Sequence, residues 1–365
     1  MLETKRRGDN EVEFVLSLHT NLSGIMIAIA LKLILGLIAI FIGANYLVDS
    51  SVAIAKRFRI SDMVIGMTLV ALGTSAPEIV VSYIGAFDGS SEIAIGNVIG
   101  SNVCNMLLVL GLATIVFPLP IAPRNRKAEI PCVLLATVLV LLLEQHFCKD
   151  FWLGKGAVNN YYLNRFGGLV LILYGVAFLV YSYLITKREQ ARSNYQYNPE
   201  EEKKSVPQLF RKIYDKKSLI PVASLVFVLS CVLLVIGGNY FVDGAKEFAK
   251  LIGMKEMTIA ATVVAVATSL PELATSVVAA FKKNSGIALG NIVGSNVLNI
   301  CLALGGSALI IPLKTSIEAA QLGFFVLSPL LLFIFALIAK KKFHRIFGVI
   351  FILLYITYIW CLLTG

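Results

Sequence analysis

The sequence predicts an all-α polytopic membrane protein with ten transmembrane helices, arranged as two inverted five-helix repeats with broken helices at the midplane. Two observations carry this prediction. The 365 residues are 58% hydrophobic and 15% charged, with a mean hydropathy of +0.82, a composition too apolar for a soluble domain. The polar motifs of segment 71–105 also recur 194 positions later, which indicates an internal duplication.

Ten apolar runs follow one another along the chain, each long enough to cross a bilayer as a helix. A spanning helix needs about 20 apolar residues, and these runs are continuous rather than alternating, unlike the strands of a β-barrel. They cover residues 24–52, 61–87, 92–118, 129–145, 166–186, 218–244, 255–281, 286–312, 319–339 and 344–364. The expected organisation is a polar, loosely ordered segment over 1–23, a first repeat over 24–186, a charged linker over 187–217 and a second repeat over 218–365.

Basic residues lie in the short loops between these runs, where they indicate topology rather than nucleic-acid binding. A cytoplasmic linker puts 21 of the 32 Lys and Arg residues on one side of the membrane, as the positive-inside rule favours. Both termini then lie outside, and the odd number of spans in each half inverts the second repeat relative to the first. We expect no nucleic-acid partner, a lipid bilayer as surroundings, the cell membrane as location and function as a monomer.

The two halves align without gaps from 43–113 to 237–307, with 32 of 71 positions identical. Both contain Thr-Ser-x-Pro-Glu, followed by Gly-Asn-x-x-Gly-Ser-Asn-x-x-Asn on the next apolar run. A carboxylate, hydroxyls and a proline within an apolar run have no explanation in packing alone. The duplicated polar motifs are therefore the candidates for function.

Each repeat places one glutamate within an apolar run, Glu78 and Glu272. A charged side chain at that depth is costly and normally faces the bundle interior beside a counter-charge. The repeated motifs contain no Lys or Arg, so a bound cation is the natural partner. The alternative is a protonated glutamate that hydrogen-bonds to a neighbouring helix, and the recurrence of both glutamates with the same hydroxyl neighbours argues against it.

Further oxygen atoms accompany each glutamate at helical spacing. Thr74 lies four residues before Glu78 and shares its face of the helix. Pro77 removes one backbone hydrogen bond and so frees the carbonyl of Gly73. The second repeat offers the equivalent set Thr268, Glu272, Pro271 and the carbonyl of Ala267.

The next run repeats this logic, since Ser101 and Asn105 share a face, as do Ser295 and Asn299. Asn97 and Asn291 lie on the same faces, and their amides either bind the ion or hold helices together. Carboxylate, hydroxyl and amide oxygens suit Ca²⁺ and Na⁺, whereas Zn²⁺ or Cu⁺ would call for His or Cys. The expected ions are substrates, and no cofactor is expected.

The paired motifs in inverted halves resemble the α-repeats of the cation/calcium antiporter superfamily, specifically its sodium/calcium exchanger branch. The resemblance implies a secondary active antiporter that exchanges Na⁺ for Ca²⁺ by alternating access, in which the first span of each half slides against the other eight. Together with Asn105 and Asn299, the cation ligands that it implies are Glu78, Glu272, Thr74, Thr268, Ser75, Ser269, Ser101, Ser295 and the carbonyls of Ala71 and Ala265.

Differences from related branches of the superfamily narrow the choice of coupling ion. The K⁺-dependent animal exchangers carry Asp at the position of Asn299, so Asn in both repeats favours K⁺-independent exchange. The Ca²⁺/H⁺ branch resembles Gly-Asn-x-x-Glu in its repeats, whereas Gly100-Ser101 and Gly294-Ser295 stand here, which disfavours proton coupling. With two carboxylates, a load of about three Na⁺, as the resemblance implies, leaves one positive charge and makes transport electrogenic.

The alternatives to this prediction are K⁺-dependent Na⁺/Ca²⁺ exchange, Ca²⁺/H⁺ antiport and, more remotely, a cation channel. Channels usually build their filters from rings of subunits, whereas inverted repeats with broken helices suit alternating access. An enzyme is not expected, because the sequence shows no evident nucleophile and base pair.

Overall fold

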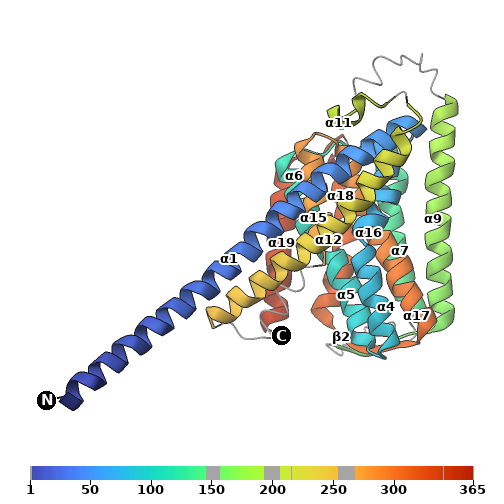
Figure 1. Cartoon of the computed structure of the whole chain (residues 1–365). Coiled ribbons are helices and arrows are strands. Elements are labelled where there is room, and N and C mark those ends of the chain that lie inside the picture. The colour runs from blue at the N-terminus through green and yellow to red at the C-terminus, as the bar shows by residue number, and fades with distance from the viewer. Residues whose placement is uncertain are drawn as a thin grey trace.

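A bundle of membrane-length helices forms the fold, and two long helices cross one face of it side by side (Figure 1). These are α1 (Leu2–Phe58) and α12 (Leu219–Leu251), drawn in blue and yellow. The computed structural model describes residues 2–144, 157–192, 206–214, 216–253, 268–339 and 341–364. The predicted carbonyl donors of Ala265 and Ala267 lie outside these residues.

The first half continues after α1 with a series of helical segments and one strand. They are α2 (Asp62–Ile65), η1 (Gly66–Val70), α3 (Ala71–Thr74), α4 (Ala76–Phe87), α5 (Ser91–Cys104), η2 (Asn105–Val109), α6 (Leu110–Val116), η3 (Asn125–Glu129), α7 (Ile130–Leu143), β1 (Ala157–Leu163) and α9 (Arg165–Arg192). The segments η1, η2 and η3 are π-helical.

The second half begins after the short helix α11 (Gln208–Arg211). Following α12, it contains α15 (Leu270–Phe281), α16 (Ser285–Leu298), the π-helical η5 (Asn299–Leu304), α17 (Gly305–Ile310), β2 (Leu313–Glu318), α18 (Ala319–Ala339) and α19 (Arg345–Thr364).

Seven helices of the described residues are long and apolar enough to span a membrane, or eight when the bent pair 62–74 and 76–87 counts as one span. These eight coincide with predicted spans. The run 129–145 is not among them, because α7 has 14 residues and η3 before it carries Arg126, Lys127 and Glu129. The run 255–281 lies partly outside the described residues, and only α15 represents it. The all-helical polytopic class is confirmed.

The N-terminal segment differs from the expectation of loose order, because α1 is one helix of 57 residues from Leu2. No proline occurs between Leu2 and Phe58 to interrupt it. The apolar part of α1 that could cross a membrane is Ile25–Phe58.

Small residues let α1 and α12 approach closely. A Cβ at Gly36 would lie 2.6 Å from the Phe241 nitrogen, and one at Gly237 would lie 2.9 Å from the Ile40 nitrogen. Backbones this close are typical of small-residue helix contacts in membranes. The ammonium of Lys32, a charge within the first apolar run, pairs with the Glu247 carboxylate of α12 at 2.5 Å. The two helices therefore form one packed pair.

The centre of the bundle consists of the continuous segments Ser91–Val116 and Ser285–Ile310. In the most apolar 18-residue stretch of each segment, 78% and 94% of the residues are buried, respectively. The corresponding figure for α1 is 17%. On α16, a Cβ at Gly290 would lie 3.0 Å from the Met67 nitrogen of η1. The second repeat's polar motif is thus packed directly against the first repeat's broken span.

Two strand pairings join the halves at opposite ends of α18. Before α18, β2 pairs antiparallel with β1, and Lys314 lies opposite Tyr162. After α18, the Ile121 nitrogen donates to the Lys341 carbonyl at 2.7 Å, and Pro120 forms a bridge with Lys342. Lys314 is the residue 194 positions after Pro120, so equivalent positions of the two repeats take part in the two pairings.

Candidate cation-binding site

The helix break that precedes each buried glutamate has the same geometry in both repeats. Ser75 has φ −83° and ψ 2°, and Ser269 has φ −85° and ψ 6°. A proline follows two residues later and has no N–H to continue the hydrogen-bond ladder. The first-repeat span bends by 47° at this point. Glu78 and Glu272 thus fall in the first turns of α4 and α15, where the helix dipole favours a carboxylate.

Both glutamates are fully buried, with 0% of their surface exposed. Ser75 donates its hydroxyl to Glu272 Oε1 at 2.8 Å, and the Ser295 hydroxyl lies 3.4 Å from the same atom. Glu272 Oε2 and both oxygens of Glu78 have no hydrogen-bond partner among the described residues. Buried carboxylate oxygens without partners are strongly disfavoured, so this site calls for a cation or a proton.

The two repeats meet at these breaks. The Thr74 hydroxyl donates to Asn291 Oδ1 at 3.0 Å and lies 3.4 Å from the Ser295 hydroxyl. On the next helix of each repeat, Asn299 Nδ2 donates to Ser101 Oγ at 3.2 Å. The structure therefore brings predicted ligands from both repeats into contact: Thr74, Ser75, Ser101, Glu272, Ser295 and Asn299.

Asn97 and Asn291 have a bracing role. Asn97 Nδ2 donates to the Glu78 carbonyl at 3.0 Å and to Ser82 Oγ at 2.9 Å. Asn291 Nδ2 donates to Ser276 Oγ at 3.0 Å and lies 3.5 Å from the Glu272 carbonyl. Of the two roles open for these amides, the structure supports joining helices, because each amide nitrogen ties its helix to the glutamate-bearing helix.

Asn105 and Asn299 begin π-helical turns, η2 and η5, at equivalent positions of the two repeats. Both are fully buried, and no described residue bonds to either amide atom of Asn105 or to Asn299 Oδ1. Single π-helical turns within α-helices are rare and frequent at functional sites. The sequence pattern predicted the asparagines but gave no signal for the π-helical turns.

Other predicted ligands lie at the edge of this cluster. The Ala71 carbonyl accepts from the Ser75 nitrogen at 2.9 Å, and the Thr74 hydroxyl lies 3.4 Å from it. The Ser269 hydroxyl is buried and has no described partner. Thr268 is half-buried and lines a cavity with Pro77 and Pro271.

Thr275 is a polar residue that the sequence analysis missed. Its side chain is fully buried, and its hydroxyl finds no partner in the part of the chain that the structure describes. It lies three residues after Glu272 and therefore on the same face of α15, a spacing that could have identified it. Its counterpart in the first repeat is Val81, so the two halves of the site are chemically unequal.

The donor set consists of oxygen atoms from carboxylates, hydroxyls and amides. No group of three or more His, Cys, Asp or Glu side chains that could hold a metal occurs within the described ranges. Oxygen donors without imidazole or thiolate suit hard cations such as Ca²⁺ and Na⁺.

A polytopic helical bundle with two buried carboxylates at the meeting point of its repeats has the architecture of a membrane transporter for cations. The profile of the sodium/calcium exchanger protein family matches residues 28–184 and 222–364. The chain belongs to this family, a family of transporters, as its motifs predict.

Individual relatives cover nearly the whole chain. The sodium/calcium exchanger MaX1 of Methanosarcina acetivorans is 32% identical over 312 residues, which are 83% of this chain and 87% of that protein. The putative antiporter CaxA of Alkalimonas amylolytica is 31% identical over 339 residues, with 91% and 98% covered. The solved structure of the sodium-calcium exchanger NCX_Mj soaked with Na⁺ and Sr²⁺ is similar with a TM-score of 0.71 at 30% identity, covering 92% of this chain and 98% of that one.

Proposed function

We propose that this protein exchanges Na⁺ for Ca²⁺ across the cell membrane by alternating access, electrogenically and without K⁺. The observation that carries the proposal is the pair of fully buried glutamates, one from each repeat, with three carboxylate oxygens that have no partner among the described residues. Two carboxylates match the charge of one Ca²⁺. Membership of the sodium/calcium exchanger family supports the choice of ions.

The proposed ligands divide by chemistry. Glu78 and Glu272 bind Ca²⁺ and compete for Na⁺. Around them, the proposed Na⁺ ligands are Thr74, Thr268, Ser75, Ser269, Ser101, Ser295 and the carbonyls of Ala71 and Ala265. Asn105 and Asn299 complete the central site through their amide oxygens. Since Ca²⁺ takes about 6–8 oxygens, ligands from both repeats are needed.

Coupling follows from the charge of the empty site. Two carboxylates without a cation are disfavoured in a low-dielectric interior, so the empty transporter does not readily change sides. One Ca²⁺ or several Na⁺ neutralise them and permit the change. A load of about three Na⁺ adds one net charge, worth ~2.3 kcal/mol per 100 mV, and this makes exchange voltage-dependent.

The moving part is proposed to be the α1–α12 pair. Its helices pack tightly on one another through Gly36 and Gly237 and cross one face of the remaining bundle (Figure 1). Sliding this pair would expose the site to one side and then to the other.

We propose ten spans in two inverted halves, with both termini outside, a cytoplasmic linker and a monomeric transporter.

K⁺-dependent Na⁺/Ca²⁺ exchange and Ca²⁺/H⁺ antiport are the two rival functions that the test distinguishes. Asn299, rather than Asp, favours K⁺ independence. Gly100-Ser101 and Gly294-Ser295, in place of a Gly-Asn-x-x-Glu pattern, disfavour H⁺ coupling. A channel is disfavoured because the site lies between two repeats of one chain and is closed off from solvent, with both glutamates 0% exposed.

The test is uptake of labelled Ca²⁺ into liposomes that carry the purified protein. Liposomes loaded with Na⁺ are diluted into Na⁺-free medium with or without K⁺. Uptake should need internal Na⁺, ignore K⁺ and vanish in Glu78→Gln and Glu272→Gln. Glu92→Gln, on the exposed start of α5, is the matched control and should retain uptake. Uptake that follows a pH gradient and ignores Na⁺ would refute the proposed coupling.

A further inference from the structure

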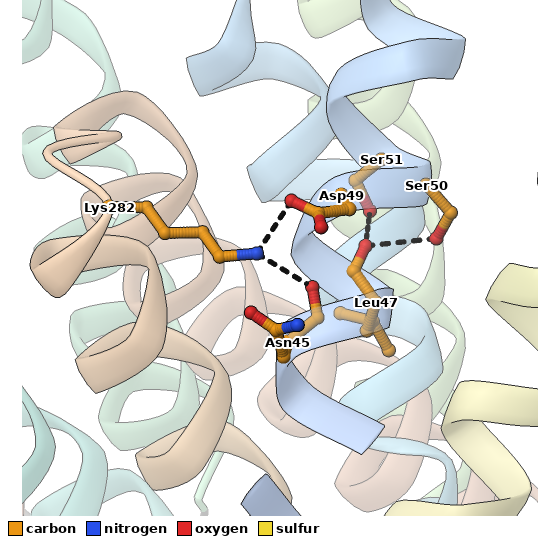
Figure 2. A network of polar contacts seen from close by, with 6 residues as sticks. All are labelled: Asn45, Leu47, Asp49, Ser50, Ser51 and Lys282. Carbon is orange, nitrogen blue, oxygen red and sulfur yellow. Dashed lines mark hydrogen bonds and ion pairs between the residues drawn. The ribbon is translucent and has the colours of Figure 1, made fainter. Parts of the chain in front are cut away.

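Lys282 connects the helix that carries Glu272 to helix α1. It caps the C-terminal end of α15, and its ammonium lies 2.5 Å from Asp49 Oδ1 and 3.0 Å from the Asn45 carbonyl. Figure 2 shows the lysine side chain extended across the gap between the two helices towards one turn of α1. In that turn, Ser50 and Ser51 donate to the Leu47 carbonyl at 3.1 and 2.7 Å. These hydroxyls therefore do not donate to Asp49, which accepts from Lys282.

This contact lies at one end of the membrane-spanning part of α1, and the Lys32–Glu247 ion pair lies at the other. The 17 positions between Lys32 and Asp49 correspond to about 25 Å along a helix. The pair at Lys32 joins α1 to α12, whereas the contact at Asp49 joins α1 to α15. The Lys32–Glu247 ion pair therefore holds α1 and α12 together. The Lys282–Asp49 contact holds α1 against α15, the helix that carries Glu272.

The inverted repeat provides an internal comparison for this contact. Asn45 and Asp49 recur as Asn239 and Asp243 on α12, but the position of Lys282 is occupied by Asp88 in the first repeat. Asn239 and Asp243 line a cavity of about 320 Å³ together with Lys246 of the same helix and the prolines of both helix breaks. The same two residues are therefore covered by a lysine at one end of the molecule and open onto a cavity at the other.

We propose that Lys282 is a tethered counter-ion that keeps the entrance beside Asp49 closed, and that the entrance beside Asp243 has no lysine at the equivalent position, where Asp88 stands. Asp88 would repel Asp243 when that entrance closes, whereas Lys282 attracts Asp49. The empty transporter is therefore biased towards the conformation that opens beside Asp243. A cation that arrives from the opposite side releases Lys282 by competing for Asp49. This inference rests on the proposed alternating access, and in the proposed topology Asp49 faces the cytoplasm.

The expected size of the bias follows from the exposure of the pair. The side chains of Lys282 and Asp49 are 29% and 18% exposed, so solvent screens their attraction. Ion pairs of this kind shift an equilibrium by about two- to fivefold. The ratio of the apparent affinities on the two sides should change by this factor, because each affinity depends on the fraction of molecules open to that side.

The test is hydrogen exchange of the full-length protein without Ca²⁺ or Na⁺, followed in the segments 41–52 of α1 and 234–246 of α12. Lys282→Gln should speed exchange about two- to fivefold in 41–52 and slow it in 234–246. Lys282→Arg should restore the wild-type pattern. Lys283→Gln is the matched control, since it removes a neighbouring charge that forms no ion pair with a described residue, and should change neither segment.

The reciprocal variant Asp88→Lys places a lysine where the second repeat has one. It should protect 234–246 and expose 41–52, the reverse of the wild-type bias. Equal exchange in wild type and Lys282→Gln, or faster exchange in both segments, would refute the proposal. Absence of Na⁺-dependent Ca²⁺ uptake by the wild type would instead refute the proposed function, so the two failures are distinguishable.

Discussion

Replacing Glu78 by glutamine should remove most of the Ca²⁺ affinity without changing the shape of the site. The side chain is fully buried, and both of its oxygens lack a described partner, so nothing else in the site compensates for the lost charge. At an effective dielectric constant of about 20, two unit charges 4 Å apart interact by about 4 kcal/mol. A carboxylate and a divalent ion would therefore interact by about 8 kcal/mol before desolvation.

If desolvation leaves one third of this energy, the variant loses about 2.7 kcal/mol, which is ~100-fold in Kd. Thermal unfolding of the purified protein measures this loss. At a Ca²⁺ concentration 100 times the wild-type Kd, the stabilisation by Ca²⁺ should fall from about 2.7 to about 0.4 kcal/mol. Glu92→Gln should keep the full stabilisation. A Glu78→Gln protein whose Ca²⁺ affinity stays within threefold of the wild type would refute the assignment of Glu78 as a central ligand.

Four further outcomes test the site and the packing around it. Gly237→Ala should destabilise the protein by about 1–3 kcal/mol, because the new Cβ would lie 2.9 Å from the backbone of α1. Gly238→Ala should be tolerated, because a Cβ there would have no atom within 4 Å. Thermal unfolding of the two variants measures the difference. Thr275→Val should weaken the apparent Na⁺ affinity about fivefold if its free hydroxyl is a ligand worth ~1 kcal/mol, and an unchanged Na⁺ dependence of Ca²⁺ uptake would assign it to packing. Asn299→Asp adds a third carboxylate and should make Ca²⁺ uptake depend on K⁺, measured with and without K⁺ in the medium. Currents across a membrane that contains the wild-type protein should change with voltage at ~2.3 kcal/mol per charge per 100 mV, and zero current at every voltage would exclude electrogenic exchange.

Local chemistry in the sequence was sufficient to predict the broken helices and their contents. A proline in the interior of a helical run removes a backbone hydrogen bond and kinks or breaks the helix, so a break next to Pro77 could be predicted from the chain alone. The spacing of four between Ser101 and Asn105 likewise predicted that the two side chains share a face, and both are buried. Repetition strengthened each of these predictions, because two copies of one motif must serve one purpose.

Contacts between distant segments could not be predicted in the same way. The helical spacing gives Glu78 and Glu272 equal surroundings, yet among the described residues only the Glu272 carboxylate accepts hydrogen bonds, from Ser75 and Ser295. Which carboxylate receives the donors depends on how the two repeats meet, and their sequences do not record this. The partner of Lys32, which lies 215 positions away on α12, is hidden from local patterns for the same reason.

The strand pairings at the two ends of α18 have a mechanical consequence. Each one fastens a segment of the first half to a segment of the second, through β1 with β2 at one end and through Ile121 with Lys341 at the other. In the proposed alternating access, halves that are joined at both ends of α18 would not rock apart as two rigid bodies. The joined segments would form a fixed frame, and the change of access would be left to elements outside these pairings, such as α1 and α12.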